Sequence, residues 1–338
     1  MLKNIIESIM RFENLSMDEA YEAMKYIIEG NASDCQISSF LTALKMKGET
    51  IDEITGFSKA MLDKAIKVKT KHKDVVDTCG TGGDMKNTFN ISTAAAFIAA
   101  GAGIIIAKHG NRSISSMCGS ADVLEQLGVN INLEIDDVSK CIDSIGIGFI
   151  FAPNAHTAMK NVAKARKDMG IKTVFNILGP ITNPAMANGR VLGVFEERLM
   201  DIMIHSLKNL GVKRAFVVYG KEGLDEFSVS GCSLVKYLNN GSVVKYTLDS
   251  VELGLRRYGI DQLRGGDSKE NARILQDILS GKEKGAKRDS SVLNAAAAIV
   301  VGGKTDSLSE AINIAVSSIE SGRALAKLNQ LIEFTNKF

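Results

Sequence analysis

The chain has 338 residues, of which 45% are hydrophobic and 24% charged, and its formal net charge is +2. This composition is ordinary for a globular protein and leaves room for one large domain, or for a large and a small one. The nearly balanced charge creates no global field that favours nucleic acid or a membrane surface, so we expect neither as a partner.

Cysteine usage and the apolar segments predict a cytoplasmic protein. Glu7 and Arg11 come too early for a secretory signal, and the apolar stretches 94–107 and 292–301 are too short to span a bilayer. The cysteines are odd in number and form no CxxC pair, which argues against a disulfide framework and against a zinc site. They are Cys35, Cys79, Cys118, Cys141 and Cys232.

The first 65 residues show helical spacing and no strand pattern. Ser16 with Glu19, and Thr50 with Glu53, match the capping box, in which the hydroxyl and the carboxylate each accept a hydrogen bond from a backbone N–H at the helix start. A further helix start is expected near Ser33. The segment therefore predicts three or four short helices in succession.

From residue 74 onward, short apolar runs alternate with helical stretches. Expected strands are 75–76, 103–107, 148–152, 190–195 and 214–219, with a hairpin of 233–238 and 242–248. Expected helices are 91–102, 121–127, 270–279, 291–301 and 307–331. This alternation is typical of a parallel sheet with helices on both faces, so the predicted fold class is α/β.

The first candidate site is the glycine-rich segment 77–84, between a strand and a helix. Its glycines allow the backbone to approach an anion, and the helix start at 90–93 adds free amides and hydroxyls. A tight turn without a ligand is the alternative. The Walker pattern is absent because no Gly-Lys-Ser/Thr follows, and the dinucleotide pattern fails because Met85 stands where a third glycine is needed.

Two further polar segments follow predicted strands. Residues 108–116 combine a lysine, an arginine, an asparagine and several serines, which suits a second anion-binding loop at the carboxyl end of the sheet. Asp225 and Glu226 are adjacent carboxylates that would suit Mg²⁺ bridged to phosphate oxygens. Taken singly, residues 108–116 could be an ordinary solvated loop, and a surface acidic pair would be the favoured explanation of Asp225 and Glu226. The loop 176–184 contains two prolines and is expected to be rigid.

Together these motifs resemble the anthranilate phosphoribosyltransferase family over nearly the whole chain. Motifs similar to those of the family occur in the family's order at 33–37, 47–50, 77–84, 87–93, 108–116, 119–125, 151–153, 156–159, 176–184, 223–226, 270–272, 285–289 and 293–296. Many long motifs in the right order make the resemblance highly specific.

The resemblance implies a small, mostly N-terminal helical domain and a large α/β domain with a central, mainly parallel sheet, as in nucleoside phosphorylases. We place the small domain at 1–70, joined by a helix near 160–185, and the large domain at 71–338. The resemblance also implies homodimers formed through the small domain. The implied reaction transfers the phosphoribosyl group of phosphoribosyl pyrophosphate (PRPP) to the amine of anthranilate in tryptophan biosynthesis, with Mg²⁺ as cofactor.

The resemblance also implies roles for matching residues. Mg²⁺ is expected at Ser92, Asp225 and Glu226, and anthranilate at Gly80, Asn111 and Arg166. PRPP is expected at Gly80, Gly83, Asp84, Thr88, Asn90, Ile91, Ser92, Thr93, Lys108, Gly110, Asn111, Arg112, Ser113, Ser115, Ser116 and Ser120. We expect no obligatory general base. His109 is the tempting one, and a role in shaping the loop or contacting substrate is at least as plausible.

Three positions depart from the family pattern. Met117 stands where many members have lysine, which we expect to weaken PRPP binding. Thr157 follows His156 where proline is usual, and Lys172 replaces a common arginine. Two other interpretations are open: a pyrimidine nucleoside phosphorylase-like enzyme, and a relative that binds nucleic acid without catalysis.

Overall fold

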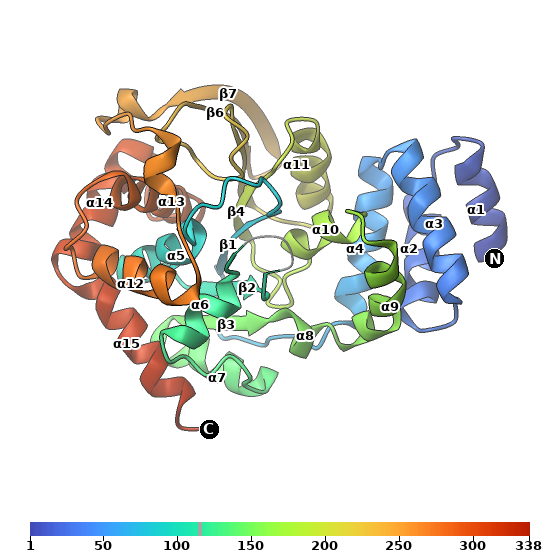
Figure 1. Cartoon of the computed structure of the whole chain (residues 1–338), viewed down its shortest axis with the longest axis horizontal. Coiled ribbons are helices and arrows are strands. Elements are labelled where there is room, and N and C mark those ends of the chain that lie inside the picture. Colours follow the sequence, from blue (N-terminus) through green and yellow to red (C-terminus); the bar gives the residue numbers. More distant parts are fainter. Residues whose placement is uncertain (114–116) are drawn as a thin grey trace.

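The structure is a computed structural model that describes residues 1–113 and 117–338. Its N-terminal part is a group of packed helices (Figure 1). Three of them begin with the capping boxes of Ser16, Ser33 and Thr50, which confirms the expected helix starts. The helices are α1 (Leu2–Met10), α2 (Met17–Ile28), α3 (Asp34–Lys47) and α4 (Ile51–Lys64).

A seven-stranded sheet forms the centre of the remaining chain. Its order is β3-β2-β1-β4-β5-β6-β7; the first five strands are parallel, and β6 and β7 complete the sheet as an antiparallel hairpin. The expected α/β fold with a mainly parallel sheet is thereby confirmed. The strands are β1 (Val76–Gly80), β2 (Ile106–Gly110), β3 (Ile147–Phe151), β4 (Gly189–Gly193), β5 (Arg214–Gly220), β6 (Cys232–Asn239) and β7 (Ser242–Asp249).

Helices connect the strands and follow the sheet. They are α5 (Ile91–Gly101), α6 (Ser120–Gln126), α7 (Ile135–Ile145), α8 (Ala152–Ala155), α9 (Lys160–Met169), α10 (Phe175–Leu178), α11 (Leu199–Asn209), α12 (Ser268–Leu279), α13 (Ala286–Val301), α14 (Leu308–Glu320) and α15 (Arg323–Thr335). Short 3₁₀ turns lie at η1 (Thr157–Met159), η2 (Gly179–Ile181), η3 (Ser250–Leu253) and η4 (Ile260–Leu263).

Alternate residues of the central strands enter two different hydrophobic clusters, because successive side chains of a strand point to opposite faces. Val191 and Phe216 pack with α5 and the C-terminal helices α12 to α15. Leu192 and Val217 pack with α11 and with residues of the N-terminal helices. Both faces of the central strands are therefore covered, which agrees with the buried residues of β3, β4 and β5.

Helices α9 and α10 lie beside the N-terminal helices although they are distant in sequence. Helix α9 contacts α2 and α3, and α10 contacts α4 (Figure 1). Val162 and Phe175 belong to the same cluster as Phe40 and Phe57 of the N-terminal helices. The segment around α9 and α10 thus runs between the helical part and the sheet.

Several expected elements differ from the structure. The first strand, β1, extends to Gly80 over residues that were expected in the glycine-rich loop, because it pairs with β4 as far as Gly193. The expected strand 103–107 is observed as β2 at Ile106–Gly110, because this stretch pairs residue by residue with β3. Lys108 and His109 consequently lie in the strand rather than in a loop. The expected helix 307–331 is interrupted at Gly322, whose φ of 75° is left-handed and separates α14 from α15.

Among the residues that the structure describes, no helix has the length and apolar character needed to cross a membrane.

Candidate active site

The sheet has a topological switch point between β1 and β4. From β1 the chain continues to β2 and β3 on one side, and β4 and β5 lie on the other. A crevice at the carboxyl ends of such strands is the usual ligand site of open α/β sheets. A cavity of about 340 Å³ lies there, lined by Gly80 at the end of β1, Gly110 at the end of β2 and Asp225 after β5.

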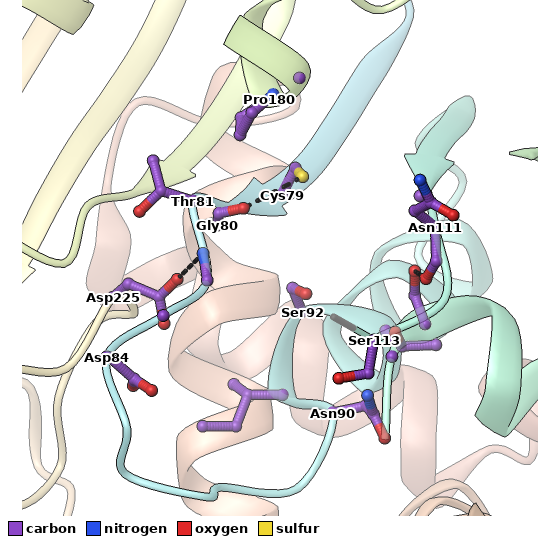
Figure 2. A pocket seen from close by; sticks show the side chains of 18 of the residues that line it. Cys79, Gly80, Thr81, Asp84, Asn90, Ser92, Asn111, Ser113, Pro180 and Asp225 are labelled. Atoms are coloured by element: carbon purple, nitrogen blue, oxygen red, sulfur yellow. Dashed lines mark hydrogen bonds between the residues drawn. The ribbon is translucent and has the colours of Figure 1, made fainter. Parts of the chain in front are cut away.

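The glycine loop and the loop after β5 that carries Asp225 and Glu226 approach each other closely at this point (Figure 2). The backbone N–H of Gly82 donates to Oδ2 of Asp225 at 2.7 Å. A Cβ at Gly80 would lie 2.4 Å from that same oxygen, and a Cβ at Gly193 only 1.5 Å from the Asp225 carbonyl oxygen. Gly80 and Gly193 are paired neighbours on β1 and β4. Both must be glycine because Asp225 occupies the space of their side chains.

The carboxylates of Asp84, Asp225 and Glu226 line the cavity. Figure 2 shows the first two of them. Burial, together with the charge of Asp84, raises the pKa of Asp225 to about 7. Burial and the charge of Asp225 also raise the pKa of Glu226 well above its ordinary value. Oδ2 of Asp84 is buried and has no hydrogen-bond partner among the described residues. The cluster is therefore a buried group of oxygen ligands whose charged forms are disfavoured unless a further cation is present.

The start of α5 faces these carboxylates with donors. The Ser92 backbone N–H donates to the Glu226 carboxylate. Lys108, which is 4% exposed, donates from Nζ to the Thr78 carbonyl at 2.6 Å and to Oγ of Ser92 at 3.3 Å. Oγ1 of Thr93 is buried without a partner among the described residues. Free donors at a helix start beside a buried ammonium group suit a phosphate.

The second loop is organised around Asp122 on α6. Its carboxylate accepts from the N–H groups of Ser113 and Gly119 at 3.0 and 2.8 Å. Arg112 lines the cavity, yet its guanidinium pairs with Asp122 at 3.1 Å and with Glu125 at 2.8 Å. The Arg112 charge is thus partly balanced inside the loop itself.

His109 lies in the wall of the cavity as a buried ring. Burial lowers its pKa well below the ordinary value, and the neighbouring His156 lowers it further; the two ring centroids are 5.2 Å apart. The ring is hydrogen-bonded to the Gly179 backbone, whereas Nε2 is buried without a partner among the described residues. A neutral imidazole that donates to a carbonyl presents its other nitrogen as an acceptor.

Several cavity residues were not expected at the site from the sequence. Nζ of Lys172 donates to the Gly83 carbonyl at 2.7 Å and lies 4.4 Å from the centre of the Phe195 ring. Lys172 comes from the segment between α9 and α10, so it connects that segment to the glycine loop. Its neighbours Asn176, Gly179 and Pro180 also line the cavity. The two prolines of their loop signalled rigidity in the sequence, but not proximity to the glycine loop.

The structure brings nearly all expected site residues together. Within the described residues, every expected PRPP residue and every expected Mg²⁺ residue lines the cavity. Ser115 and Ser116 lie outside the described residues. Arg166 does not line the cavity: its guanidinium lies 5.0 Å from the Phe175 ring centre, and burial lowers its pKa. The expected contact of Arg166 with anthranilate stays a prediction.

Two family models match the chain. A helical bundle domain of the glycosyl transferase family matches residues 3–65, and an a/b domain of the glycosyl transferase family matches residues 72–325. Together they account for most of the chain.

Individual relatives match over their full lengths. The anthranilate phosphoribosyltransferase of Pelotomaculum thermopropionicum is 53% identical over 99% of this chain and 97% of its own. That of Acetivibrio thermocellus is 51% identical over 100% and 98%.

Solved structures agree with these matches. The crystal structure of anthranilate phosphoribosyltransferase from Thermus thermophilus superposes with a TM-score of 0.93 at 39% identity, covering 98% of this chain and 99% of its own. The Saccharomyces cerevisiae enzyme in complex with PRPP and Mg gives 0.92 at 30% identity, covering 100% and 98%. The chain therefore belongs to the anthranilate phosphoribosyltransferase family of glycosyl transferases.

Proposed function

We propose that this chain transfers the phosphoribosyl group of PRPP to the amine of anthranilate in tryptophan biosynthesis. The amine nitrogen forms a bond to C1 of the ribose with inversion, the bond from C1 to pyrophosphate breaks, and the amine loses a proton. The supporting observation is the cavity in which the glycine loop, Lys108 and the carboxylates of Asp225 and Glu226 meet. Full-length relatives near 50% identity carry this activity in their names.

The glycine loop and the start of α5 are proposed to hold the pyrophosphate and phosphate groups. Gly83, Thr88, Asn90 and Ser92 supply backbone and side-chain donors around the cavity. Lys108 adds a buried positive charge, which strengthens each contact with an anion in a site of low dielectric constant.

Mg²⁺ fits the acidic side of the cavity. Asp225 and Glu226, with the Ser92 hydroxyl nearby, would hold it, because hard oxygen ligands are those that Mg²⁺ prefers. Burial raises the pKa values of both carboxyls even though Lys108 acts on Glu226 in the opposite direction, so a further cation would favour their charged forms. When bound, the ion would neutralise charge that develops on the departing pyrophosphate.

The chain's own residues contribute mainly alignment and electrostatic stabilisation. Lys108 would stabilise the charge of the leaving group. Asn111 and Gly80, the expected contacts of anthranilate, line the same cavity. A sugar centre that reacts through an oxocarbenium-like state gains most from such positioning. His109 is a neutral ring in the cavity wall, which suits shaping of the site rather than action as an obligatory base.

The assembly and the domain division belong to the same proposal. We assign the small domain to 1–70 with the segment near 160–185, and the large domain to 71–338. The packing of α9 on α2 and α3 supports this assignment. A homodimer through the small domain is supported by the exposed side chains of Met10, Phe12 and Met46. We place the enzyme in the cytoplasm.

Product analysis tests the activity. The purified protein, incubated with Mg²⁺, PRPP and anthranilate, should form a product with the mass of N-(5-phosphoribosyl)anthranilate and release one pyrophosphate per product. The matched assay supplies inorganic phosphate with thymidine or uridine and should release no free base. Phosphorolysis of the nucleosides without product formation from anthranilate would replace the proposal with a nucleoside phosphorylase.

A further inference from the structure

Residues 87–89, which lead from the glycine loop to α5, contact residues 263–265, which are distant in sequence. The Phe89 N–H donates to the Leu263 carbonyl at 3.0 Å, and the Gly265 N–H donates to the Asn87 carbonyl at 3.0 Å. Thr88 and Arg264 form an isolated antiparallel bridge between these two hydrogen bonds. A Cβ at Gly265 would lie 2.7 Å from Cα of Phe89, so the two segments are in direct backbone contact. The conformation of residues 87–89, between the glycine loop and α5, therefore depends on residues 263–265.

One buried side chain continues this contact into the active site. Asn271, on the first turns of α12, is 1% exposed. Its Oδ1 accepts from the Gly266 N–H at 2.9 Å, and its Nδ2 donates to Oδ1 of Asn90 at 3.0 Å. Nδ2 of Asn90 in turn donates to the Cys118 carbonyl at 3.0 Å. Asn90 immediately precedes α5 and lines the cavity. Cys118, which lies just before α6, also lines it.

The direction of this hydrogen-bond chain is fixed at both ends by the backbone. The Gly266 N–H can only donate, so the oxygen of the Asn271 amide must face it. The Cys118 carbonyl can only accept, so the nitrogen of the Asn90 amide must face it. The two side-chain amides between these ends have one orientation each that satisfies every group. This removes the usual ambiguity between the oxygen and the nitrogen of an amide.

We propose that Asn271 is a positioning residue that orients the Asn90 amide and thereby holds the start of α5 and the backbone at Cys118 at the spacing that PRPP requires. Asn271 does not line the cavity, so its effect passes through Asn90. The inference rests on the proposed function only for the identity of the ligand. The contact between residues 84–90, 263–266 and 118 is a property of the chain itself.

Replacing the amide nitrogen of Asn271 by oxygen should change the hydrogen bonds that Asn90 makes. Asn271→Asp keeps the shape and the acceptor for Gly266 but removes the donor to Asn90. Either two oxygens then face each other at Asn90, or the Asn90 amide turns and its oxygen faces the Cys118 carbonyl. Both arrangements leave a buried acceptor opposite another acceptor, which is costly.

Asn188 provides a matched control at the opposite end of the sheet. Its Oδ1 accepts from the Val75 N–H at 3.0 Å, and its Nδ2 donates to the Lys73 carbonyl at 3.1 Å and to Oδ1 of Asp74 at 2.8 Å. Asn188→Asp removes the same kind of hydrogen bond just before β1, far from the carboxyl ends of the strands. It should reduce thermal stability without changing PRPP binding.

The experiment compares wild type, Asn271→Asp, Asn271→Ser and Asn188→Asp by steady-state kinetics, thermal unfolding and amide hydrogen exchange. We expect both Asn271 variants to raise KM for PRPP about tenfold or more, with KM for anthranilate changed less than about twofold. In the protein without substrates, exchange at the Phe89 and Gly265 amides should become faster in these variants, and stay as in wild type in Asn188→Asp.

Two results would overturn the inference. One is a folded Asn271 variant with the wild-type KM for PRPP. The other is unchanged exchange at Phe89 and Gly265, which applies even if the wild-type protein does not use anthranilate. The serine variant is too short to reach Asn90 but adds no charge, so it serves if the aspartate variant does not fold. Failure of the proposed function would appear separately, as wild-type protein that forms no product from PRPP and anthranilate.

Discussion

The Gly82 backbone N–H donates a 2.7 Å hydrogen bond to Oδ2 of Asp225, which joins the loop after β1 to the loop after β5. The two loops are distant in sequence and meet only because β1, β4 and β5 are adjacent in the sheet. The group expected to hold Mg²⁺ is therefore positioned by the same backbone that is expected to hold phosphate. A disturbance of either loop should affect the binding of both ligands.

Gly80→Ala tests this connection. The new methyl group would lie 2.4 Å from Oδ2 of Asp225, so the carboxylate must move away from Gly82. We expect kcat/KM for PRPP to fall about 100-fold or more, with a higher Mg²⁺ concentration needed for half-maximal rate. Gly285→Ala is the control, because its methyl group would meet only the end of the Glu283 side chain. Wild-type kinetics and Mg²⁺ dependence in the Gly80→Ala variant would refute the connection.

Met117→Lys should tighten PRPP binding. Met117 is 63% exposed beside the second loop and stands where many family members carry lysine. A positive charge there adds screened attraction for pyrophosphate, so we expect KM for PRPP to decrease about two- to fivefold at low ionic strength and less in high salt. Val244→Lys, with the same charge change on exposed β7, should have no effect. Equal KM values in wild type and Met117→Lys would rule the effect out.

His109→Asn tests whether the buried imidazole is needed as a base. Burial keeps His109 neutral, and its Nε2 is buried without a partner among the described residues, which suits a ring that shapes the cavity wall. We expect kcat to fall about tenfold, because alignment and leaving-group stabilisation supply most of the rate. A loss of about 1,000-fold or more in kcat with normal KM values would instead identify His109 as an essential base.

His156 should make the fold sensitive to acid. Burial lowers the His156 pKa to about 4, and the ordinary value for an unfolded chain is about 6.5. Between these values the unfolded chain binds the proton more readily than the folded one, so stability falls as the pH is lowered from about 6.5 to about 4. Over this pH range the shifted pKa of His156 changes the free energy of unfolding by about 3 kcal/mol.

Denaturant unfolding at several pH values checks this expectation. His156→Gln should be less stable than wild type near neutral pH but should lose less stability on acidification. Identical pH profiles for the two proteins would show that another group is responsible.

Local sequence signals predicted the helix starts and the general fold well. Ser16, Ser33 and Thr50 each form the expected cap, because a capping box involves residues only three positions apart. The alternation of apolar runs predicted the parallel sheet. The limits of β2 were wrong, since Lys108 and His109 have the polarity of loop residues, whereas pairing with β3 extends the strand over them.

The parts of the site that depend on long-range contacts could not be predicted from the residues alone. Lys172 contacts Gly83 only because α9 and α10 lie between the helical part and the sheet. Asn271 reaches Asn90 from the other end of the chain. Neither contact leaves a local pattern, and the motif order of the family gave no role to Asn271. The glycine loop was recognisable because its chemistry is contained in consecutive residues.

Anthranilate fluorescence is the most direct test of the proposed transfer reaction. In a solution of the purified protein, Mg²⁺ and anthranilate, addition of PRPP should make the fluorescence of anthranilate disappear with time. The decrease should stop when the Mg²⁺ is chelated, and the Gly80→Ala variant should show it far more slowly. Constant fluorescence at micromolar wild-type enzyme with excess PRPP and Mg²⁺ would contradict the central claim.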